Sequence, residues 1–393
     1  MDGWDEVCID SDGAVGAFAV LHPGKSRIIS STAKISTNYF SVGGYAGTFL
    51  NMGLVALICL LLYVLTGTTA NNVSTLAFIL TLGFGSWGIN VLNMWFPMLG
   101  VVVGNLLKKD KPLANVNAML FSTGLAPIIS DILVRYPHAE VIGFNVLGVL
   151  LAVVVGIIAG LAISSGLPHS PNVHKGFNLY SAALPVGMTT FFLNAMLYKV
   201  MGIDLPGAAG DMAVNSWANT NIFCFVVFGA CILFALLMGC KPKDYWKLLT
   251  DPALVTNFSS TYGNAVFLMN LGVYGLFILG YYNLIGASFN GVTFGIIFCM
   301  LACCNSGSHP GNVWPIMLGY FVASTVCGWI APLFGGNFTL AVNAQAICVG
   351  LCYANGLSPI SDKYGWQYGF LAAVMHYLLV TSVPTLHGGF CLY

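Results

Sequence analysis

The chain carries an internal duplication that includes polar residues as well as apolar ones. Residues 37–100 align with residues 256–319 at a constant shift of 219 positions and without a gap. The recurring polar residues include Asn93 and Asn312, each of which follows a glycine-containing interruption of an apolar run. A duplicated apolar chain whose polar residues recur in register is typical of transporters and of some channels.

The composition places this duplicated chain in a membrane. Of the 393 residues, 58% are hydrophobic and only 7% are charged, whereas about 25% of residues are charged in ordinary soluble proteins. The clearest apolar runs approach the roughly 20 residues that cross a hydrocarbon core as a helix. These runs cover residues 44–66, 141–165, 217–239 and 265–284. We therefore expect an all-α, polytopic membrane protein of two internal structural repeats.

Charge balance and missing motifs argue against several other classes of protein. The 13 basic and 13 acidic residues give zero net charge, so nothing suggests a nucleic-acid partner. Most of the 12 cysteines lie inside apolar segments, and no C-x-x-C pair or other ligand spacing suggests a metal. Walker A, H-E-x-x-H and G-x-S-x-G patterns do not occur. The chain is therefore predicted to need no cofactor and not to be an enzyme.

Changes in charge and polarity divide the chain into four predicted parts. These are a polar N-terminal segment at 1–36, membrane repeat 1 at 37–200, a connecting helix and basic loop at 201–255, and membrane repeat 2 at 256–393. The motif P-x-x-H-x-G-F-x-L-Y leads into an apolar stretch in the first copy but ends the second, so we expect that repeat 2 is truncated. Basic residues precede both repeats, which favours a parallel relation, while inverted symmetry stays open.

Interruptions rich in glycine and proline predict broken or re-entrant helices in both repeats. The apolar stretch at 73–107 contains GFGSWGIN, and its counterpart contains CCNSGSHPGN at 303–312. Irregular backbone is tolerated at membrane depth only where it is buried in protein or lines a watery cavity. Asn93 and Asn312 follow these breaks, so they are candidates for contact with a solute, although stitching helices together is the commoner use of asparagine in membranes.

A second duplicated motif contains carboxylates. GLAPIISD at 124–131 matches GLSPISD at 356–362. An aspartate inside a membrane segment costs roughly 2.5–3.5 kcal/mol on insertion scales, so it usually faces a cavity or a partner. Alternatively, nearby Arg135 and Lys363 mark the end of a helix at the membrane interface. The candidate residues for ion or proton coupling are Asp131, Asp362, Ser130 and Ser361.

A histidine motif recurs with one spacing in both copies. In each copy the histidine is followed by a glycine, which permits close backbone approach, and by an aromatic residue. The imidazole could hold a switchable proton near neutral pH, or it could simply cap a buried loop carbonyl. The candidate substrate-binding residues are therefore His174, Gly176, His387, Gly389, Asn93 and Asn312.

Three runs of sequence carry a resemblance to a known family. GLAPIISD, SPNVHKGFNLY at 170–180 and GLSPISDKYG at 356–365 resemble an uncharacterised bacterial family, domain of unknown function 1576. The resemblance covers nearly the whole chain from about residue 37. It implies a multipass protein of the bacterial plasma (inner) membrane, and it implies no activity, substrate or site residue.

We expect a secondary transporter or channel for a small neutral or singly charged solute, with a pathway between the two repeats. Its partners would be the lipid bilayer and a small solute or ion, and a homo-oligomer stays open. The alternative is a membrane-embedded enzyme acting on a lipid or isoprenoid substrate, with His174, Asp131 and their counterparts as acid–base groups. A non-catalytic scaffold or sensor would leave the recurring polar residues unexplained.

Overall fold

The structure, a computed structural model, consists of helices. It describes residues 38–138, 142–202, 217–250, 257–338 and 340–386. Within these ranges the chain forms no strand, and the predicted all-α fold is confirmed. The predicted polar segment at 1–36 lies outside the described residues.

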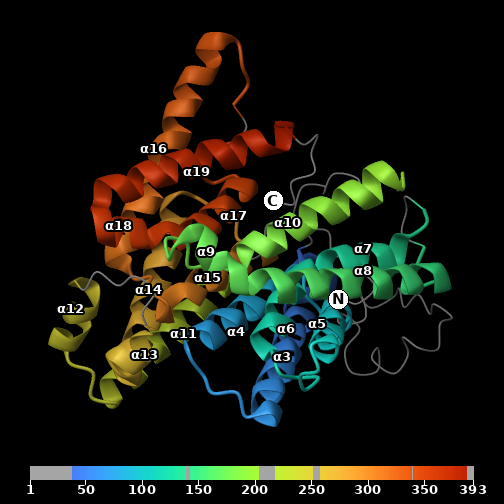
Figure 1. Ribbon diagram of the computed structural model, residues 1–393. Coiled ribbons are helices and arrows are strands. Elements are labelled where there is room, and N and C mark those ends of the chain that lie inside the picture. The colour runs from blue at the N-terminus through green and yellow to red at the C-terminus, as the bar shows by residue number, and fades with distance from the viewer. Residues whose placement is uncertain (1–37, 139–141, 203–216, 251–256, 339, 387–393) are drawn as a thin grey trace, which may run out of the picture.

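The helices form two adjoining bundles, coloured blue to green and orange to red in Figure 1. The first half contains α3 (Tyr39–Thr66), α4 (Asn72–Phe84), α5 (Trp95–Leu107), α6 (Val116–Ser122), α7 (Ala126–Arg135), α8 (Val146–Gly166), α9 (Ser170–His174) and α10 (Ala183–Asn194). A connecting region contributes α11 (Trp217–Leu237) and α12 (Pro242–Thr250). The second half contains α13 (Phe258–Thr261), α14 (Asn264–Leu284), α15 (Gly291–Leu301), α16 (Pro310–Ile330), α17 (Gln345–Ala354), α18 (Ser358–Tyr364) and α19 (Trp366–Leu386).

Six helical segments of the described chain are long and apolar enough to cross a membrane. They are Tyr39–Thr66, Val116–Arg135, Val146–His174, Thr220–Leu237, Asn264–Leu284 and Pro310–Phe334. Large apolar side chains stay exposed on the outer faces of several of them, as Phe225 (64%) and Val64 (74%) illustrate. In water such faces would be costly, whereas lipid tails are an apolar solvent for them. The fold is therefore that of a polytopic membrane protein.

Each half contains a helix that stops beside the middle of its long neighbour. Helix α4 begins beside the C-terminal end of α3, where the Tyr63 hydroxyl donates to Ser74 O at 3.3 Å. It ends beside Asn51, whose Nδ2 donates to Gly85 O and Ile89 O, both at 2.8 Å. The chain leaves helical geometry after Phe84 and resumes it only in α5, so the predicted break is present.

The second half repeats this arrangement around Asn270. Its Nδ2 donates to Cys304 O at 2.9 Å and to Ser308 O at 3.0 Å, where α15 has given way to a 3₁₀ turn before α16 begins. The three positions follow Asn51, Gly85 and Ile89 at the same shift of 219. These mid-helix asparagines satisfy backbone carbonyls that a helix break would otherwise leave unpaired in an apolar environment.

The two short helices, α4 and α15, lie side by side and run antiparallel. The first turn of α4 meets the end of α15, since Asn305 Nδ2 donates to Thr75 Oγ1 at 3.1 Å. At the other end, Ser86 Oγ donates to Gly291 O at 2.7 Å. A two-fold axis relating these helices would be perpendicular to them, because an axis along the helices would leave them parallel. If α4 and α15 run across the membrane, this packing favours the inverted relation over the parallel one.

Glycines at matched positions allow the other helices to approach closely. A Cβ on Gly100 of α5 would lie 2.6 Å from Gly156 O of α8. A Cβ on Gly319 of α16, 219 positions later, would lie 2.7 Å from Phe370 O of α19. Both distances are too short for a side chain, so only glycine permits these crossings. The pairs α5–α8 and α16–α19 are thus packed in the same way.

Candidate functional site

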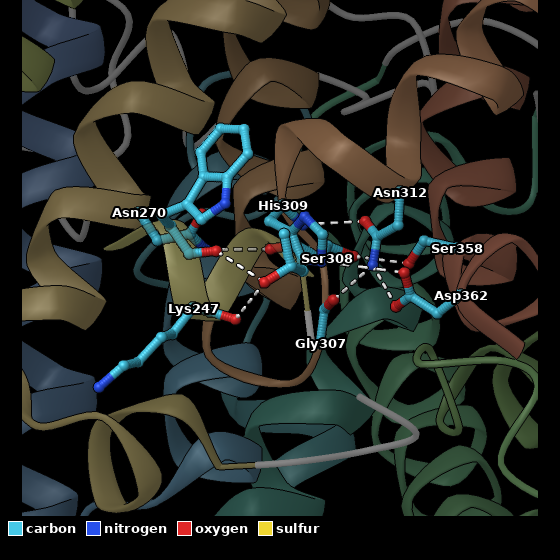
Figure 2. Close-up of polar contacts among 10 residues, drawn as sticks. Lys247, Asn270, Gly307, Ser308, His309, Asn312, Ser358 and Asp362 are labelled. Atoms are coloured by element: carbon cyan, nitrogen blue, oxygen red, sulfur yellow. Dashed lines mark hydrogen bonds and ion pairs between the residues drawn. The ribbon is translucent and has the colours of Figure 1, made fainter. Parts of the chain in front are cut away.

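The helix break in the second half is closed by one asparagine at the start of α16. Asn312 Oδ1 accepts a hydrogen bond from His309 N at 3.0 Å, and Asn312 Nδ2 donates to Gly307 O at 2.8 Å. The same Nδ2 reaches the neighbouring helix α18, where it donates to Asp362 Oδ2 at 2.7 Å (Figure 2). Pro310 occupies the first turn of α16, where its missing N–H costs nothing. The break is therefore ordered by its own sequence and tied to α18.

A histidine and a carboxylate face each other beside this asparagine. The His309 side chain is 1% exposed, and its Nε2 lies 3.9 Å from Asp362 Oδ1. That nitrogen has no hydrogen-bond partner within the described parts of the chain. A buried polar atom left without a partner costs about 1–3 kcal/mol, so this pair is an exception to the general pairing of buried groups.

Two serines, an asparagine and a phenylalanine form the rest of the wall around the break. Ser308 Oγ lies 3.1 Å from Ser358 Oγ at the start of α18. On the opposite side, Ser308 O accepts from Asn270, and the Phe258 ring lies 6.3 Å from the imidazole of His309, centre to centre. These contacts hold the imidazole in place without bonding its Nε2.

The first half builds the same break from neutral residues. Asn93 Oδ1 accepts from Asn90 N at 2.8 Å, while Asn93 Nδ2 donates to Gly88 O at 2.9 Å and to Ser130 Oγ at 2.8 Å. Asn90 stands 219 positions before His309, and Ser130 bonds Asn93 as Asp362 bonds Asn312. The geometry recurs, but the titratable pair is present in one half only.

This geometry corrects the sequence pairing of Asp131 with Asp362. GLSPISD is one residue shorter than GLAPIISD, so counting from the shared glycine matches Asp362 with Ser130 and Ser361 with Ile129. The Asn93–Ser130 bond agrees with that count. Pairing the two motifs from their C-terminal aspartates therefore gave the wrong register.

Asp131 lies in a separate ion pair. Arg135 Nε and Nη2 donate to Asp131 Oδ1 and Oδ2, both at 2.9 Å, and the Tyr198 hydroxyl donates to Oδ2 at 2.8 Å. Both charged side chains are buried, at 3% and 8% exposure. A bidentate arginine and a phenol satisfy most of what a buried carboxylate requires. Arg135 of the same helix thus compensates the charge of Asp131. Tyr198, in the π-helical turn Ala195–Val200 that follows α10, adds a hydrogen bond.

The duplicated histidine motif caps its own loop in the first copy. His174 Nε2 lies 2.9 Å from Ser181 Oγ, and His174 Nδ1 accepts from Gly176 N at 3.2 Å. Gly176 has φ of 86°, which glycine adopts without strain. His387 and Gly389 lie outside the described residues. These bonds tie His174 to its own loop, although neither partner is the loop carbonyl of the capping alternative.

The same motif also joins the two halves, which sequence reasoning missed. Leu179 N donates to Gly356 O at 2.9 Å, and the buried Tyr180 hydroxyl donates to Cys299 O at 2.7 Å. The loop after α9 thus contacts the 3₁₀ turn Asn355–Leu357 between α17 and α18. Asn355 Nδ2 donates to Met300 O at 2.9 Å in the same network. The first copy of this motif therefore binds the first half to the second.

His309 was overlooked because it has no counterpart in the duplication. The matched position is Asn90, and a histidine facing an asparagine looks like ordinary divergence in a single sequence. The polar candidates in the sequence are residues that are identical in the two copies. His309 would have been found by looking for a matched position at which one copy has an amide and the other a titratable residue. In the sequence, Arg135 was interpreted only as the mark of a helix end at the membrane interface. The structure shows that it forms an ion pair with Asp131.

Comparisons with known proteins identify one family. The family described as "Protein of unknown function (DUF1576)" matches residues 19–199 and 241–393. No curated protein and no solved structure matches the chain.

Proposed function

The chain belongs to the DUF1576 family of proteins of unknown function, and we propose that it carries a small neutral or singly charged solute across a membrane. The observation that carries this proposal is the pair of helix breaks, each beside the middle of a long apolar helix and each tied to a mid-helix asparagine. Broken helices at the midplane are where many transporters bind their substrates. We place the protein in the plasma membrane of a bacterium.

The antiparallel pair α4–α15 supports an inverted repeat with two gates. The first break adjoins the start of α15 through Ser86 and Gly291, and the second adjoins the start of α4 through Asn305 and Thr75. The breaks therefore lie at opposite ends of one central helix pair. Rocking of one half against the other about such a pair would open the two ends in turn, as alternating access requires.

Close packing at the centre favours a carrier over an open channel. A Cβ on Gly83 would lie 2.7 Å from Gly295 O, and one on Gly295 would lie 2.4 Å from Gly83 O. No solute passes between backbones this close, so passage would need relative movement of the two helices. Movements of this kind occur on the microsecond to millisecond scale, which fits a carrier.

The asparagines receive a different role from the one first expected. Asn93 and Asn312 are each 1% exposed, and their amides bond to the backbone of their own break and to the neighbouring helix. We propose that they hold the breaks closed and that solute passes when these bonds are exchanged. Among the described residues near the breaks, the charged side chains are few and mostly paired, which supports a solute with little or no charge.

Uptake by reconstituted vesicles tests the proposal. We expect saturable uptake of at least one neutral amide or polyol, or of one singly charged ion such as ammonium, formate or nitrate, by vesicles that contain the protein. Vesicles without protein report leakage. Turnover of lipid or isoprenoid by the purified protein, without uptake of any solute, would replace the carrier by the membrane-embedded enzyme.

A cross-link across the central helix pair tests the movement itself. Cys299 Sγ lies 3.9 Å from Leu80 O, so Leu80→Cys should be joined to Cys299 by a short, reducible reagent with two thiol-reactive ends. We expect the cross-link to stop uptake and its reduction to restore it. The matched control, L80C with C299S, carries one of the two thiols and should keep its uptake after the same treatment. Undiminished uptake by cross-linked protein would remove the rocking motion.

A further inference from the structure

The break before α16 buries an imidazole beside a carboxylate in an otherwise apolar protein. His309 Nε2 stands 3.9 Å from Asp362 Oδ1, too far for a hydrogen bond, and it bonds to no other described residue. The Asp362 side chain is 11% exposed, against 1% for His309. The carboxylate is therefore the more exposed member of the pair.

Two phenols lie near the pair, Tyr245 in α12 and Tyr262 directly after α13. The Tyr245 hydroxyl lies 3.4 Å from Asn270 Oδ1, so α14 stands between it and the imidazole. The Tyr262 ring packs on Phe258, centre to centre 5.8 Å, and Phe258 in turn faces His309. Neither phenol supplies a charge at the pair.

The nearby lysines are turned elsewhere. Lys363 follows Asp362 in sequence, but its ammonium lies 4.9 Å from the centre of the Phe177 ring. Lys247 is directed away from the break in Figure 2 and lies 3.9 Å from Asp244 at the exposed surface. Among the residues that the structure describes, Asp362 is therefore the charged group that faces His309.

The first half offers a natural comparison for this pair. Asn90 and Ser130 occupy the places of His309 and Asp362, and Asn93 makes the same bonds there as Asn312. A break of this geometry therefore forms with neutral residues alone. The titratable pair is an addition to the break that its closure does not require.

We propose that His309 and Asp362 together hold one exchangeable proton, which makes the second break a proton-linked gate of the carrier proposed above. Without that proton the two side chains together carry one net negative charge, and Asn312 and the N-terminal end of α16 lie beside it. One added proton makes the two side chains neutral together. Moving charge through a membrane is costly, so a change of one charge at this gate changes the cost of moving it, and the proton thereby controls the gate. This inference rests on the proposed function for its link to solute, but not for the proton itself.

The step needs no group beyond the two side chains and a proton from water. A proton reaches the Asp362 carboxylate, which becomes a carboxylic acid. When the 3.9 Å gap closes, the acid passes that proton to Nε2 of His309. The products are an imidazolium and a carboxylate in contact, and the two side chains together carry no net charge. Release reverses the step, so no oxidant, reductant or metal takes part.

Infrared titration of the purified, full-length protein tests the proton directly. We expect one carboxylate band that shifts as the pH is lowered, because the imidazolium then bonds to that carboxylate. The band should be absent in Asp362→Asn, and in His309→Asn it should give way to a carboxylic-acid band at low pH. His169→Asn, an exposed histidine, is the matched control and should leave the band unchanged. A band that is untouched by His309→Asn, or the absence of any band sensitive to Asp362→Asn, would overturn the shared proton.

The double variant H309N/D362S separates gating from folding. It gives the second break the residues of the first, so we expect it to keep the thermal midpoint of the parent protein. In vesicles, an inward proton gradient should drive the parent to accumulate solute at least about tenfold more than the double variant, a typical coupling between two sites. Equal accumulation by both proteins would overturn the proton link.

The outcomes for solute and for proton are distinguishable. A titrating carboxyl band together with no movement of any solute would sink the carrier and leave the proton pair standing. Accumulation that follows a sodium gradient and ignores the proton gradient would overturn the link between proton and solute, while the infrared titration decides the shared proton. Loss of the folded state in H309N/D362S would contradict the equivalence of the two breaks, and Asp362→Asn would then carry the test of the proton.

Discussion

Leu80 and Cys299 stand 219 positions apart in the chain and are in contact, with the Cys299 thiol 3.9 Å from the Leu80 carbonyl oxygen. They occupy matched positions of α4 and α15. When matched residues of two related segments touch, the axis that relates the segments must pass close to them. The antiparallel course of α4 and α15 then sets that axis perpendicular to the helices. We infer that the two halves have opposite orientations in the membrane.

Opposite orientation makes a specific prediction for two matched loops. Thr69, between α3 and α4, and Ser288, between α14 and α15, are both exposed and lie 219 positions apart. Substituted singly by cysteine, they should react with an impermeant thiol reagent from opposite sides of sealed membrane vesicles. The parent protein supplies the background from its own cysteines, most of which are buried in the described chain. Labelling of both positions from one side would restore a parallel relation.

Features of local sequence were predictable, and the breaks are the main example. An interruption rich in glycine and proline within an apolar run predicts a broken helix, because these residues do not continue a regular helix. The role of Asn51 and Asn270 in stitching helices follows from the same reasoning, since a freed carbonyl at membrane depth needs a donor. Composition alone was enough for the all-α membrane class.

Relations across space were not predictable from one sequence. Asp131 and Asp362 both end a similar motif, yet a single deleted residue moves one of them onto the face of Asn312 and leaves the other beside Arg135. A shift of one residue turns a helical side chain by about 100°, so a motif match within one residue does not place a side chain. The pairing of His309 with Asp362 was not predictable either, because 53 residues separate these two side chains along the chain.

Removing a stitching asparagine should destabilise the fold. Asn270→Ala leaves the carbonyls of Cys304 and Ser308 without their donor in a dry environment. Since each unpaired buried group costs about 1–3 kcal/mol, we expect a loss of about 2 kcal/mol or more, measured as denaturant unfolding in detergent. Asn343→Ala, at an exposed position, is the control and should stay close to the parent. A variant as stable as the parent would mean that water or lipid replaces the asparagine.

Two glycines inside helices should respond in opposite directions to the same change. Gly295→Ala places a Cβ 2.4 Å from Gly83 O, so α4 and α15 must move apart, and overpacking of this kind typically costs about 1–3 kcal/mol. Gly280→Ala in α14 meets no atom within 4 Å. It should be neutral or stabilising by up to about 1 kcal/mol, because alanine is the better helix former. Thermal unfolding of the two variants measures the difference, and equal midpoints would contradict the close approach of α4 to α15.

The ion pair of Asp131 with Arg135 should behave as a structural unit and not as a coupling site. Arg135→Gln leaves the buried Asp131 carboxylate without its cation, which typically costs about 3–5 kcal/mol, so it should lower the unfolding midpoint strongly. Asp131→Asn takes the bidentate carboxylate away from the buried guanidinium and should lower the midpoint as well. The double variant leaves no bare charge and should regain part of that stability, since replacing a whole buried pair is often close to neutral. Accumulation of solute per folded molecule, driven by a proton gradient, should be the same in the double variant as in the parent. A double variant that folds but ignores the gradient would move the coupling role from Asp362 to Asp131.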